Sequence, residues 1–192
     1  GVEIHAANGY LLDQFLRDGS NRRTDSYGGS LENRTRLLLE VTDAVVGVWG
    51  ADRVGVRLSP INGFNSMSDK APDVTFTYAA RQLNRYGLAF LHVVEPDFTG
   101  SETAFDYAAL RATFDGAYIA NGGYDLDRAQ AALASDAADL VSFGKPFLAN
   151  PDLVERFARG APLNQPDPAT FYGGDAKGYT DYPFLDTATA AA

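Results

Sequence analysis

A histidine, an asparagine and a tyrosine lie close together near the start of the chain. His5, Asn8 and Tyr10 all fall within residues 5–10, directly after a short run rich in β-branched residues. His5 and Asn8 can both donate hydrogen bonds to one ligand oxygen, and the phenol of Tyr10 can donate a proton. The same spacing also suits a buried histidine, a helix-capping asparagine and a packed tyrosine. The cluster alone leaves both interpretations open.

A single arginine stands in an otherwise apolar run. Arg57 lies between Val56 and Leu58, shortly before Pro60. A buried cation needs a partner, so this position indicates either an anionic ligand or a buried carboxylate. The residues around it do not decide between the two.

Two glycine-rich turns come late in the chain. The first contains Asn121, Gly122 and Gly123, and the second contains Gly144 and Lys145. Their backbone N–H groups could hold a phosphate, and Lys145 would add positive charge. Each turn alone could simply be a tight connection, but two of them on consecutive units favour a phosphate site.

Other polar residues carry weaker signals. His92 lies in the middle of an apolar run, and we expect it to be a core histidine with satisfied hydrogen bonds. Glu95 and Asp97 could form the carboxylate pair of a hydrolase, but Pro96 separates them and no partner follows a neighbouring strand. Tyr172 lies in a loop-like tail, where it could border a pocket or pack against the rim of the fold.

The composition excludes several classes of protein. The chain has 192 residues and a formal net charge of -9, which argues against binding to nucleic acid. It contains 0 Cys and 2 His, so it can form neither a disulfide framework nor a thiolate or multi-histidine metal site, and we expect no metal. No run approaches the roughly 20 apolar residues of a membrane span.

Short apolar runs alternate with longer helical patterns along the chain, which is typical of βα units with a parallel sheet. Ser30 and Asp73 are expected to cap helices, and Pro151 to lie in the first turn of the last one. Strands are expected over residues 2–5, 54–59, 88–94, 117–120 and 140–143, and helices over residues 10–16, 30–49, 73–86, 104–113, 126–134 and 152–159.

Two architectures fit this alternation: an open doubly wound sheet and part of an eight-stranded barrel. Both place their sites at the carboxyl ends of the strands. The glycine-rich turns favour the barrel, because barrels often bind phosphate after strands 7 and 8. The chain would then hold about strands 4–8 of a (β/α)8 TIM barrel, with the first three strands missing. We expect residues 1–160 to form this partial barrel and residues 161–192 to be an extension at its rim with a frayed end.

Several stretches together resemble the Old Yellow Enzyme family of flavin-dependent ene-reductases. Residues 2–16 resemble its active-site segment, and residues 21–34 are similar to its most specific signature. Three further stretches follow in the family's order and approximate spacing: residues 54–60, 120–123 and 143–153. Residues 170–183 resemble the bacterial N-ethylmaleimide reductase and xenobiotic reductase branch.

The resemblance implies a cytoplasmic oxidoreductase that holds FMN non-covalently, takes reducing equivalents from NAD(P)H and reduces enones, maleimides, nitroalkenes and possibly nitro compounds. His5 and Asn8 would bind the substrate's oxygen, and Tyr10 would protonate its α-carbon. Arg57 would contact the flavin ring. The remaining implied site residues hold the phosphate or border the substrate pocket: Asn121, Gly122, Gly123, Gly144 and Lys145 for the phosphate, and Tyr172 for the pocket.

Two departures from the family bear on these expectations. Lys145 stands where the family usually has Arg, so a bidentate fork becomes a point charge. The family's N-terminal part, which supplies the first three strands, has no counterpart here, so we expect the chain to be active only with a complementing segment. A non-catalytic barrel fragment that acts as a binding module, and a barrel enzyme for a phosphorylated substrate, are the alternatives.

Overall fold

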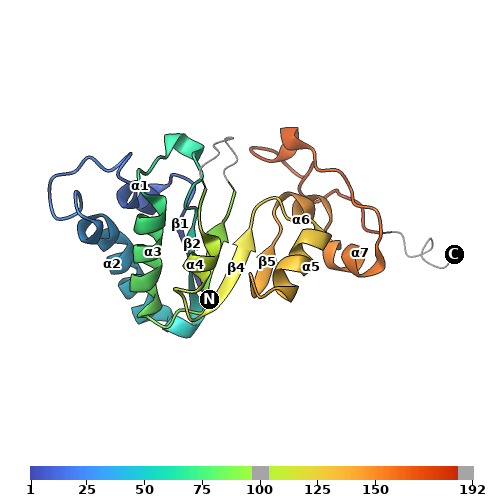
Figure 1. Ribbon diagram of the computed structural model, residues 1–192. Helices are drawn as coiled ribbons and strands as arrows, with labels where there is room; N and C mark the ends of the chain where they lie inside the picture. Colours follow the sequence, from blue (N-terminus) through green and yellow to red (C-terminus); the bar gives the residue numbers. More distant parts are fainter. Residues whose placement is uncertain (97–103, 186–192) are drawn as a thin grey trace. The chain divides into compact units, whose positions relative to one another are not determined.

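The computed structural model describes residues 1–96 and 104–185, and its centre is a parallel sheet. The sheet has five strands in chain order, β1-β2-β3-β4-β5, as the alternation of runs predicts (Figure 1). The strands are β1 (Val2–Ala6), β2 (Val54–Leu58), β3 (Phe90–Val94), β4 (Ala117–Asn121) and β5 (Leu140–Ser142). Because each strand pairs only with its neighbours in sequence, every connection is a βα crossover.

The longest helix shows why these connections are helical. Ser30 caps α2 by accepting a hydrogen bond from the Asn33 N–H at 3.4 Å, as predicted, and Gly50 ends it at a φ of +80°. The α-helices are α1 (Leu11–Leu16), α2 (Leu31–Trp49), α3 (Pro72–Asn84), α4 (Tyr107–Arg111), α5 (Leu126–Ala134), α6 (Lys145–Ala149) and α7 (Leu153–Arg159). Three 3-10 helices accompany them within the described residues: η1 (Ala51–Arg53), η2 (Phe64–Ser66) and η3 (Pro168–Thr170).

Two predicted helix starts are wrong by a few residues. Helix α3 begins at Pro72, so Asp73 lies inside its first turn and does not cap it. Proline is favoured at the first helical position because its missing N–H would be unpaired there anyway. Pro151 precedes the cap residue Asp152, and so it lies just outside α7. Helix α6 was not predicted, because its five residues follow a glycine and begin Lys-Pro, which reads as a turn.

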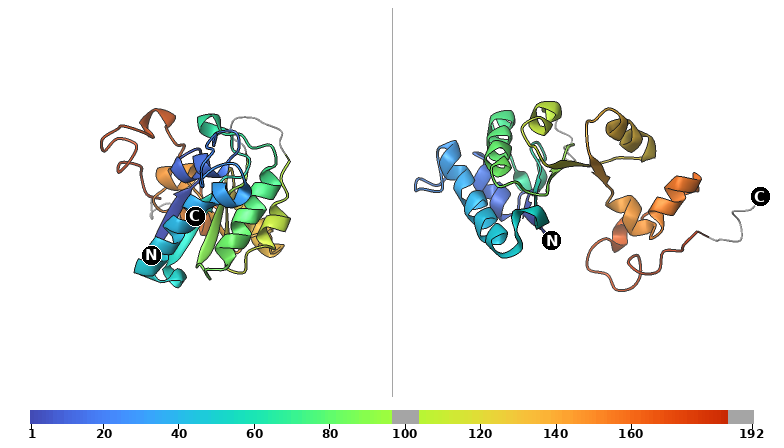
Figure 2. Two further views of the ribbon diagram at one scale, coloured as in Figure 1. Left: turned by 90° about the vertical axis from the view of Figure 1, so that its left-hand side faces the viewer. Right: turned by 90° about the horizontal axis from the view of Figure 1, so that it is seen from below.

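The hydrophobic core lies between the sheet and its helices. Side chains on one face of the strands pack against α2 and α3, which lie beside β1 and β2 (Figures 1 and 2). Because successive side chains of a strand alternate between faces, the core takes every second residue. The strand residues of this core are Ile4, Ala6, Val54, Val56, Leu58, Leu91, Val93, Tyr118 and Ala120.

The opposite face of the sheet carries polar residues. The register places His5, Arg57 and His92 on adjacent strands in one row. Glu3 lies two residues before His5 and therefore on this same face. We call this the inner face, because it would line the inside of a barrel. The face under the helices is thus apolar, whereas the inner face carries these polar residues beside apolar ones such as Phe90, Val94 and Ile119.

The chain divides into two compact units, Gly1–Ser142 and Phe143–Ala192. In the second unit, the buried guanidinium of Arg156 donates to Asp152 and to the carbonyl oxygens of Pro162 and Pro183, which holds α7 to the tail. The division at residue 160 into barrel and extension stays a prediction, and the predicted frayed end from residue 186 lies outside the described residues.

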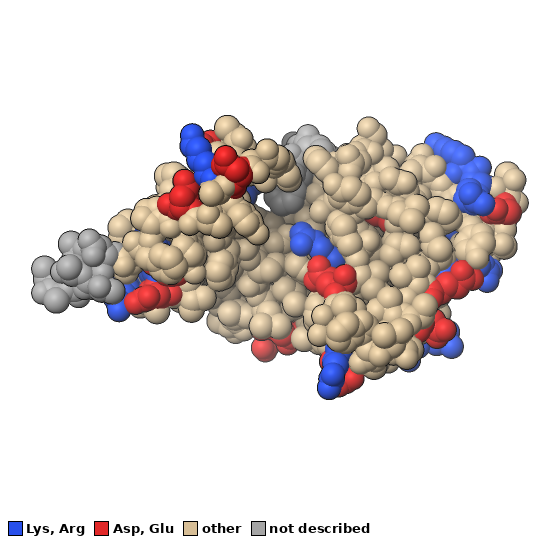
Figure 3. Space-filling view, turned by 180° about the vertical axis from the view of Figure 1, so that it is seen from behind, with Lys and Arg blue, Asp and Glu red and all other residues tan. Residues whose placement is uncertain are grey.

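Charged side chains of both signs are mixed on the surface. On the face in Figure 3, the described Lys and Arg side chains stand among Asp and Glu and form no continuous basic area. Within the described ranges, no helix is both long enough and apolar enough to cross a membrane.

Candidate active site

His5 and Tyr10 meet at the carboxyl end of β1. Their ring centroids are 5.2 Å apart and the planes are tilted by 47°. Both side chains are exposed, and 53% of Tyr10 is accessible. The chain reverses between them because Asn8 and Gly9 adopt positive φ angles of 56° and 73°. The structure therefore brings the predicted cluster together on one turn.

The turn has no room for a side chain at Gly9. A Cβ atom there would lie 2.6 Å from the Cβ of Asn65 and 2.8 Å from the Phe64 carbonyl oxygen. Asn65 in turn donates from its side chain to the Asn8 carbonyl oxygen at 2.9 Å. The loop that follows β2 is thus packed directly on the reactive turn.

A buried ion pair supports this turn from below. Asp13 accepts hydrogen bonds from the Gly9 N–H and from Arg17 Nε, each at 2.8 Å. Both charged side chains are almost completely buried, at 0% and 1% exposure. Arg17 also donates to Ser59, whose Oγ accepts from the Asn8 N–H at 2.7 Å. Burial raises the pKa of Asp13, while Arg17 and the other hydrogen bonds act in the opposite direction.

The side chain of Asn8 is oriented by a second asparagine. Asn62 Nδ2 donates to Asn8 Oδ1 at 3.4 Å. With its oxygen used in this way, the Asn8 amide presents its NH2 group as the part that can donate to a ligand. This orientation matches the donor role expected from the sequence, although the role itself stays a prediction.

His5 is placed near two charges on the inner face. Its pKa lies below the ordinary value because burial and the positive charge of Arg57 disfavour protonation, against the opposing charges of Glu3 and Asp13. The imidazole is therefore neutral at neutral pH and can donate one hydrogen bond without carrying a net charge.

Arg57 is bound to an amide on β4. Its Nη2 donates to Asn121 Oδ1 at 2.8 Å, while its buried Nε has no hydrogen-bond partner among the residues that the structure describes. Burial lowers the pKa of Arg57, and the charge of Glu3 raises it. None of the described carboxylates forms an ion pair with Arg57. Of the two interpretations left open by the sequence, this geometry favours a ligand.

Three further residues of the inner face were not among the predicted site residues: Glu3, His92 and Ser142. His92 is buried with both ring nitrogens bonded, as predicted for a core histidine, but its partners are Glu3 at 2.8 Å and Ser142 at 2.7 Å. Asn121 Nδ2 donates to Ser142 Oγ at 2.9 Å. The two-residue spacing that puts Glu3 on the same face as His5 could have pointed to Glu3, but His92 and Ser142 lie on other strands and are joined to it only by the fold.

The first glycine-rich turn follows β4, as predicted. Gly122 and Gly123 have φ angles of 116° and 64°, which favour glycine. Arg128 Nη1 donates to the Gly122 carbonyl oxygen at 3.1 Å and holds the turn against α5.

Glu95 is a structural acceptor in this part of the fold. The hydroxyls of Tyr118 and Tyr124 donate to its two oxygens at 3.2 and 2.5 Å. Burial and the carboxylate raise the pKa of Tyr124 to about 12. Asp97, the other half of the carboxylate pair considered above, lies outside the described residues.

The remaining predicted residues belong to the second unit. Gly144 is the cap residue of α6, Lys145 is the first residue of that helix, and both are exposed. Tyr172 is 91% exposed. Their roles toward a phosphate or a substrate stay predictions.

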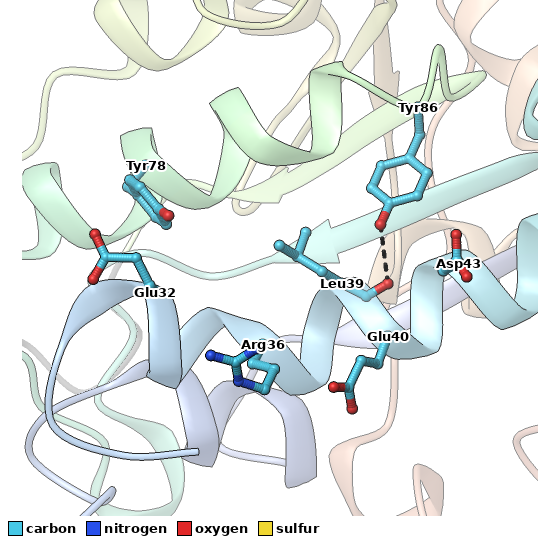
Figure 4. Close-up of a pocket in the computed structure, with 7 residues that line it drawn as sticks. All are labelled: Glu32, Arg36, Leu39, Glu40, Asp43, Tyr78 and Tyr86. Atoms are coloured by element: carbon cyan, nitrogen blue, oxygen red, sulfur yellow. Dashed lines mark hydrogen bonds between the residues drawn. The ribbon is translucent and has the colours of Figure 1, made fainter. Parts of the chain in front are cut away.

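A cavity of about 360 Å³ lies away from all of these residues, between α2 and α3. Tyr86 lines this cavity and donates from its hydroxyl to the Leu39 carbonyl oxygen at 3.2 Å (Figure 4). The other lining residues are Glu32, Arg36, Glu40, Asp43 and Tyr78. None of the predicted site residues takes part in it.

Comparison with known proteins identifies the family. Residues 1–164 match the NADH:flavin oxidoreductase / NADH oxidase family. The chain belongs to this family. A probable flavin mononucleotide-dependent alkene reductase of Leishmania infantum is 51% identical over 185 residues, which are 96% of this chain and 50% of that protein. The relatives in this family are flavin-dependent oxidoreductases.

Solved structures of Old Yellow Enzyme relatives have the same fold. Morphinone reductase matches with a TM-score of 0.93 and 53% identity, covering 98% of this chain and 51% of its own. It has also been solved in complex with tetrahydroNAD. The old yellow enzyme from Trypanosoma cruzi matches with a TM-score of 0.93 and 40% identity, covering 97% and 50%. The chain therefore spans about half the length of the relatives it matches.

Arg57 provides a test of whether the residues present fit the flavin of this family. Its Nε is a buried donor without a partner in the described part of the chain, and Arg57 lies beside His5 on the inner face. A buried donor is stable when an acceptor reaches it, and the flavin ring offers carbonyl oxygens and ring nitrogens. The residues of this face fit an FMN ring.

Proposed function

We propose that this chain is part of an FMN-dependent reductase that acts on activated alkenes (enones, maleimides and nitroalkenes) and on nitro compounds. The observation that carries the proposal is the turn with His5, Asn8 and Tyr10 beside the partnerless Nε of Arg57, in a chain of a flavin oxidoreductase family. When bound, FMN supplies the hydride, which it takes from NAD(P)H. The cytoplasmic location stays a prediction.

His5 and Asn8 would bind the substrate's carbonyl or nitro oxygen. Hydrogen bonds fixed before the reaction stabilise the negative charge that develops on this oxygen, and such donors need no reorganisation. The turn is well built for this task, because Ser59 and Asn65 hold the backbone of Asn8 on both sides. A neutral His5 donates without adding a charge that substrate binding would have to compensate.

Tyr10 would give a proton to the α-carbon of the substrate. Its ring packs on His5 at a centroid distance of 5.2 Å, so the proton donor and the oxygen-binding groups are held to one another. Its exposure of 53% leaves the hydroxyl accessible from solvent for reprotonation.

Arg57 and the glycine-rich turns would hold the cofactor. Arg57 would bind an acceptor on the flavin ring through Nε. Gly122 and Gly123 would present backbone N–H groups to the phosphate, and Asn121 would keep Arg57 in place. We propose that Gly144 and Lys145 complete the phosphate site and that Tyr172 borders the substrate pocket.

We further propose that the five strands are strands 4–8 of a TIM barrel of the bacterial N-ethylmaleimide and xenobiotic reductase branch. The position of the glycine-rich turns after β4 and β5 supports this numbering. The remaining strands would come from an N-terminal complementing segment, and the reductase would be active only when that segment is present. Leu140 on β5, with 51% exposure, would then be covered by the missing strands.

The test is the variant Tyr10→Phe in the protein with its complementing segment. Reduction of an enone by the reduced protein should slow at least tenfold, because only the proton donor is lost. Reduction of the flavin by NAD(P)H should stay within about twofold, since this half-reaction needs no proton from Tyr10. Equal losses in both half-reactions would refute the assignment.

A flavin spectrum tests the complementation. The 192-residue chain alone should purify without stoichiometric FMN, and addition of the N-terminal segment should restore it. A yellow, active protein from the isolated chain would show that the segment is unnecessary. Stabilisation by sugar phosphates without any bound chromophore would favour a different barrel enzyme.

A further inference from the structure

One hydrogen-bonded chain runs across the inner face and takes one residue from each of the five strands. Arg57 Nη2 on β2 bonds to Asn121 Oδ1 on β4 at 2.8 Å, and Asn121 Nδ2 bonds to Ser142 Oγ on β5 at 2.9 Å. Ser142 Oγ lies 2.7 Å from His92 Nε2, and His92 Nδ1 lies 2.8 Å from Glu3 on β1. We call this the inner-face chain.

The two ends of the inner-face chain fix the direction of every bond except the one between Ser142 and His92, which a neutral His92 ring completes. A guanidinium can only donate, and an ionised carboxylate can only accept. Asn121 must therefore accept from Arg57 and donate to Ser142. His92 donates from Nδ1 to Glu3 and, as a neutral ring, accepts the Ser142 hydroxyl proton at Nε2. All donors point from the cation of Arg57 toward the carboxylate of Glu3.

We propose that His92 is a positioning residue for Arg57, acting through Ser142 and Asn121 with Glu3 as the final acceptor. This inference rests on the proposed function, in which Arg57 binds the flavin ring. His92 suits the role because only 7% of it is exposed and each ring nitrogen has a fixed partner.

Two groups of Ser142 hold the Asn121 amide: Nδ2 donates to the backbone carbonyl oxygen at 3.1 Å and to Oγ at 2.9 Å, and His92 acts on the second of these contacts. A flipped amide would turn its NH2 group toward the guanidinium, so that two donors would face each other. The Ser142 carbonyl oxygen can only accept and so disfavours the flipped orientation, and a Ser142 hydroxyl that donates to His92 adds a second acceptor for the amide NH2, which holds Asn121 more firmly. Arg57 Nη2 is then always occupied, and the partnerless Nε is left to bind the ligand.

The tautomer of His92 gives a first test that needs no flavin. In 15N-labelled protein with its complementing segment, the ring nitrogens of His92 should show a protonated Nδ1 and a bare Nε2, assigned by comparison with His92→Asn. Free histidine in water favours the opposite tautomer. Finding the proton on Nε2, or on both nitrogens at pH 7, would overturn the direction of the inner-face chain.

The reduction potential gives the second test, through the variant His92→Leu. Loss of the inner-face chain frees Arg57, so a fixed positive charge near the flavin is lost. The ratio of the affinities for reduced and oxidised FMN should fall by about tenfold, which equals about 30 mV in the two-electron midpoint potential. Val93→Ala, on the same strand but facing the core, should leave the potential unchanged.

A double variant shows whether His92 acts through Arg57. The potential of Arg57→Met should not move further when His92→Leu is added, because nothing remains to be positioned. Additive shifts would refute the proposal. If His92→Leu fails to fold or to bind flavin, Ser142→Ala removes a single hydroxyl and should shift the potential in the same direction. A wild-type protein that binds no flavin would refute the proposed function, while the tautomer test would still decide the inner-face chain.

Discussion

The buried pair of Asp13 and Arg17 offers the sharpest prediction about the stability of the site. In the variant Arg17→Met, the side chain keeps a similar length but loses its charge and its contacts with Asp13, Ser59 and the Phe76 ring, 5.2 Å away. Asp13 would be left as a carboxylate with 0% exposure and no cation. Removal of one partner from a buried pair costs about 3–5 kcal/mol of unfolding free energy.

The assay is urea unfolding of the protein with its complementing segment, followed by circular dichroism at pH 7. Arg159→Met is a matched control, since Arg159 and Glu155 are also four residues apart on a helix but are about half exposed. The control should lose only about 0.3–0.5 kcal/mol, as exposed pairs of this spacing do. A loss for Arg17→Met within 1 kcal/mol of the control would refute the reasoning.

The pH dependence of this loss has a definite sign. Without Arg17, the pKa of folded Asp13 lies above 3.8, the value for an unperturbed Asp. The folded variant then binds more protons than the unfolded chain above that pH, so its stability falls as the pH rises. The deficit of Arg17→Met should therefore shrink on acidification toward pH 4, and Asp13→Asn combined with Arg17→Met should recover part of it at pH 7.

Three further predictions concern other parts of the site. Arg57→Gln should raise the pKa of His5 and Glu3→Gln should lower it, as followed by NMR titration, because the two charges act on the imidazole with opposite signs. The folded-state pKa of His5 lies below 6.5, so the stability of the wild type falls as the pH drops through this value, and Arg57→Gln should reduce that fall. An unchanged His5 pKa in both variants would contradict this electrostatic account. Gly9→Ala should lose clearly more stability in urea unfolding than the control Gly29→Ala. Gly29 has a positive φ of 81° but no atom near the position of a Cβ, so this control should cost only about 1–2 kcal/mol. Equal losses would mean that the contact between residue 9 and the loop after β2 relaxes. Lys145→Arg should tighten FMN binding about fivefold in a titration, the effect of one added hydrogen bond of about 1 kcal/mol, and unchanged affinity would contradict a phosphate role for this position.

The order and type of the large elements could be predicted from the sequence, because apolar periodicity and capping residues such as Ser30 act locally. The cluster around His5 could also be found, since its three members lie on one turn. The inner-face chain could not be found in this way. Its bonds join residues as far apart as Glu3 and His92, and only the pairing of the strands brings them together on one face of the sheet. The apolar residues around His92 predicted that it is buried, and it is. They could not predict its polar partners, which come from β1 and β5.

The support of Asn8 by Asp13 and Arg17 was missed for a related reason. Charged residues in the sequence around a short helix are expected to face solvent. Here the loop after β2 covers them, and Ser59 at the end of β2 supplies the acceptor that makes burial possible. The spacing of residues around Asp13 and Arg17 cannot predict a partner that lies more than 40 residues away in the sequence.

Three asparagines of the site, Asn8, Asn62 and Asn121, are each followed by glycine. A glycine leaves the next backbone nitrogen least shielded, so this pair of residues is where an asparagine amide is most easily lost with age. Conversion of Asn8 to aspartate would remove the NH2 donor of the turn after β1, and conversion of Asn121 would remove the donor that the inner-face chain needs. If Asn8 and Asn121 have the proposed roles, such an aged protein would lose reductase activity while its circular dichroism spectrum stays that of the folded chain.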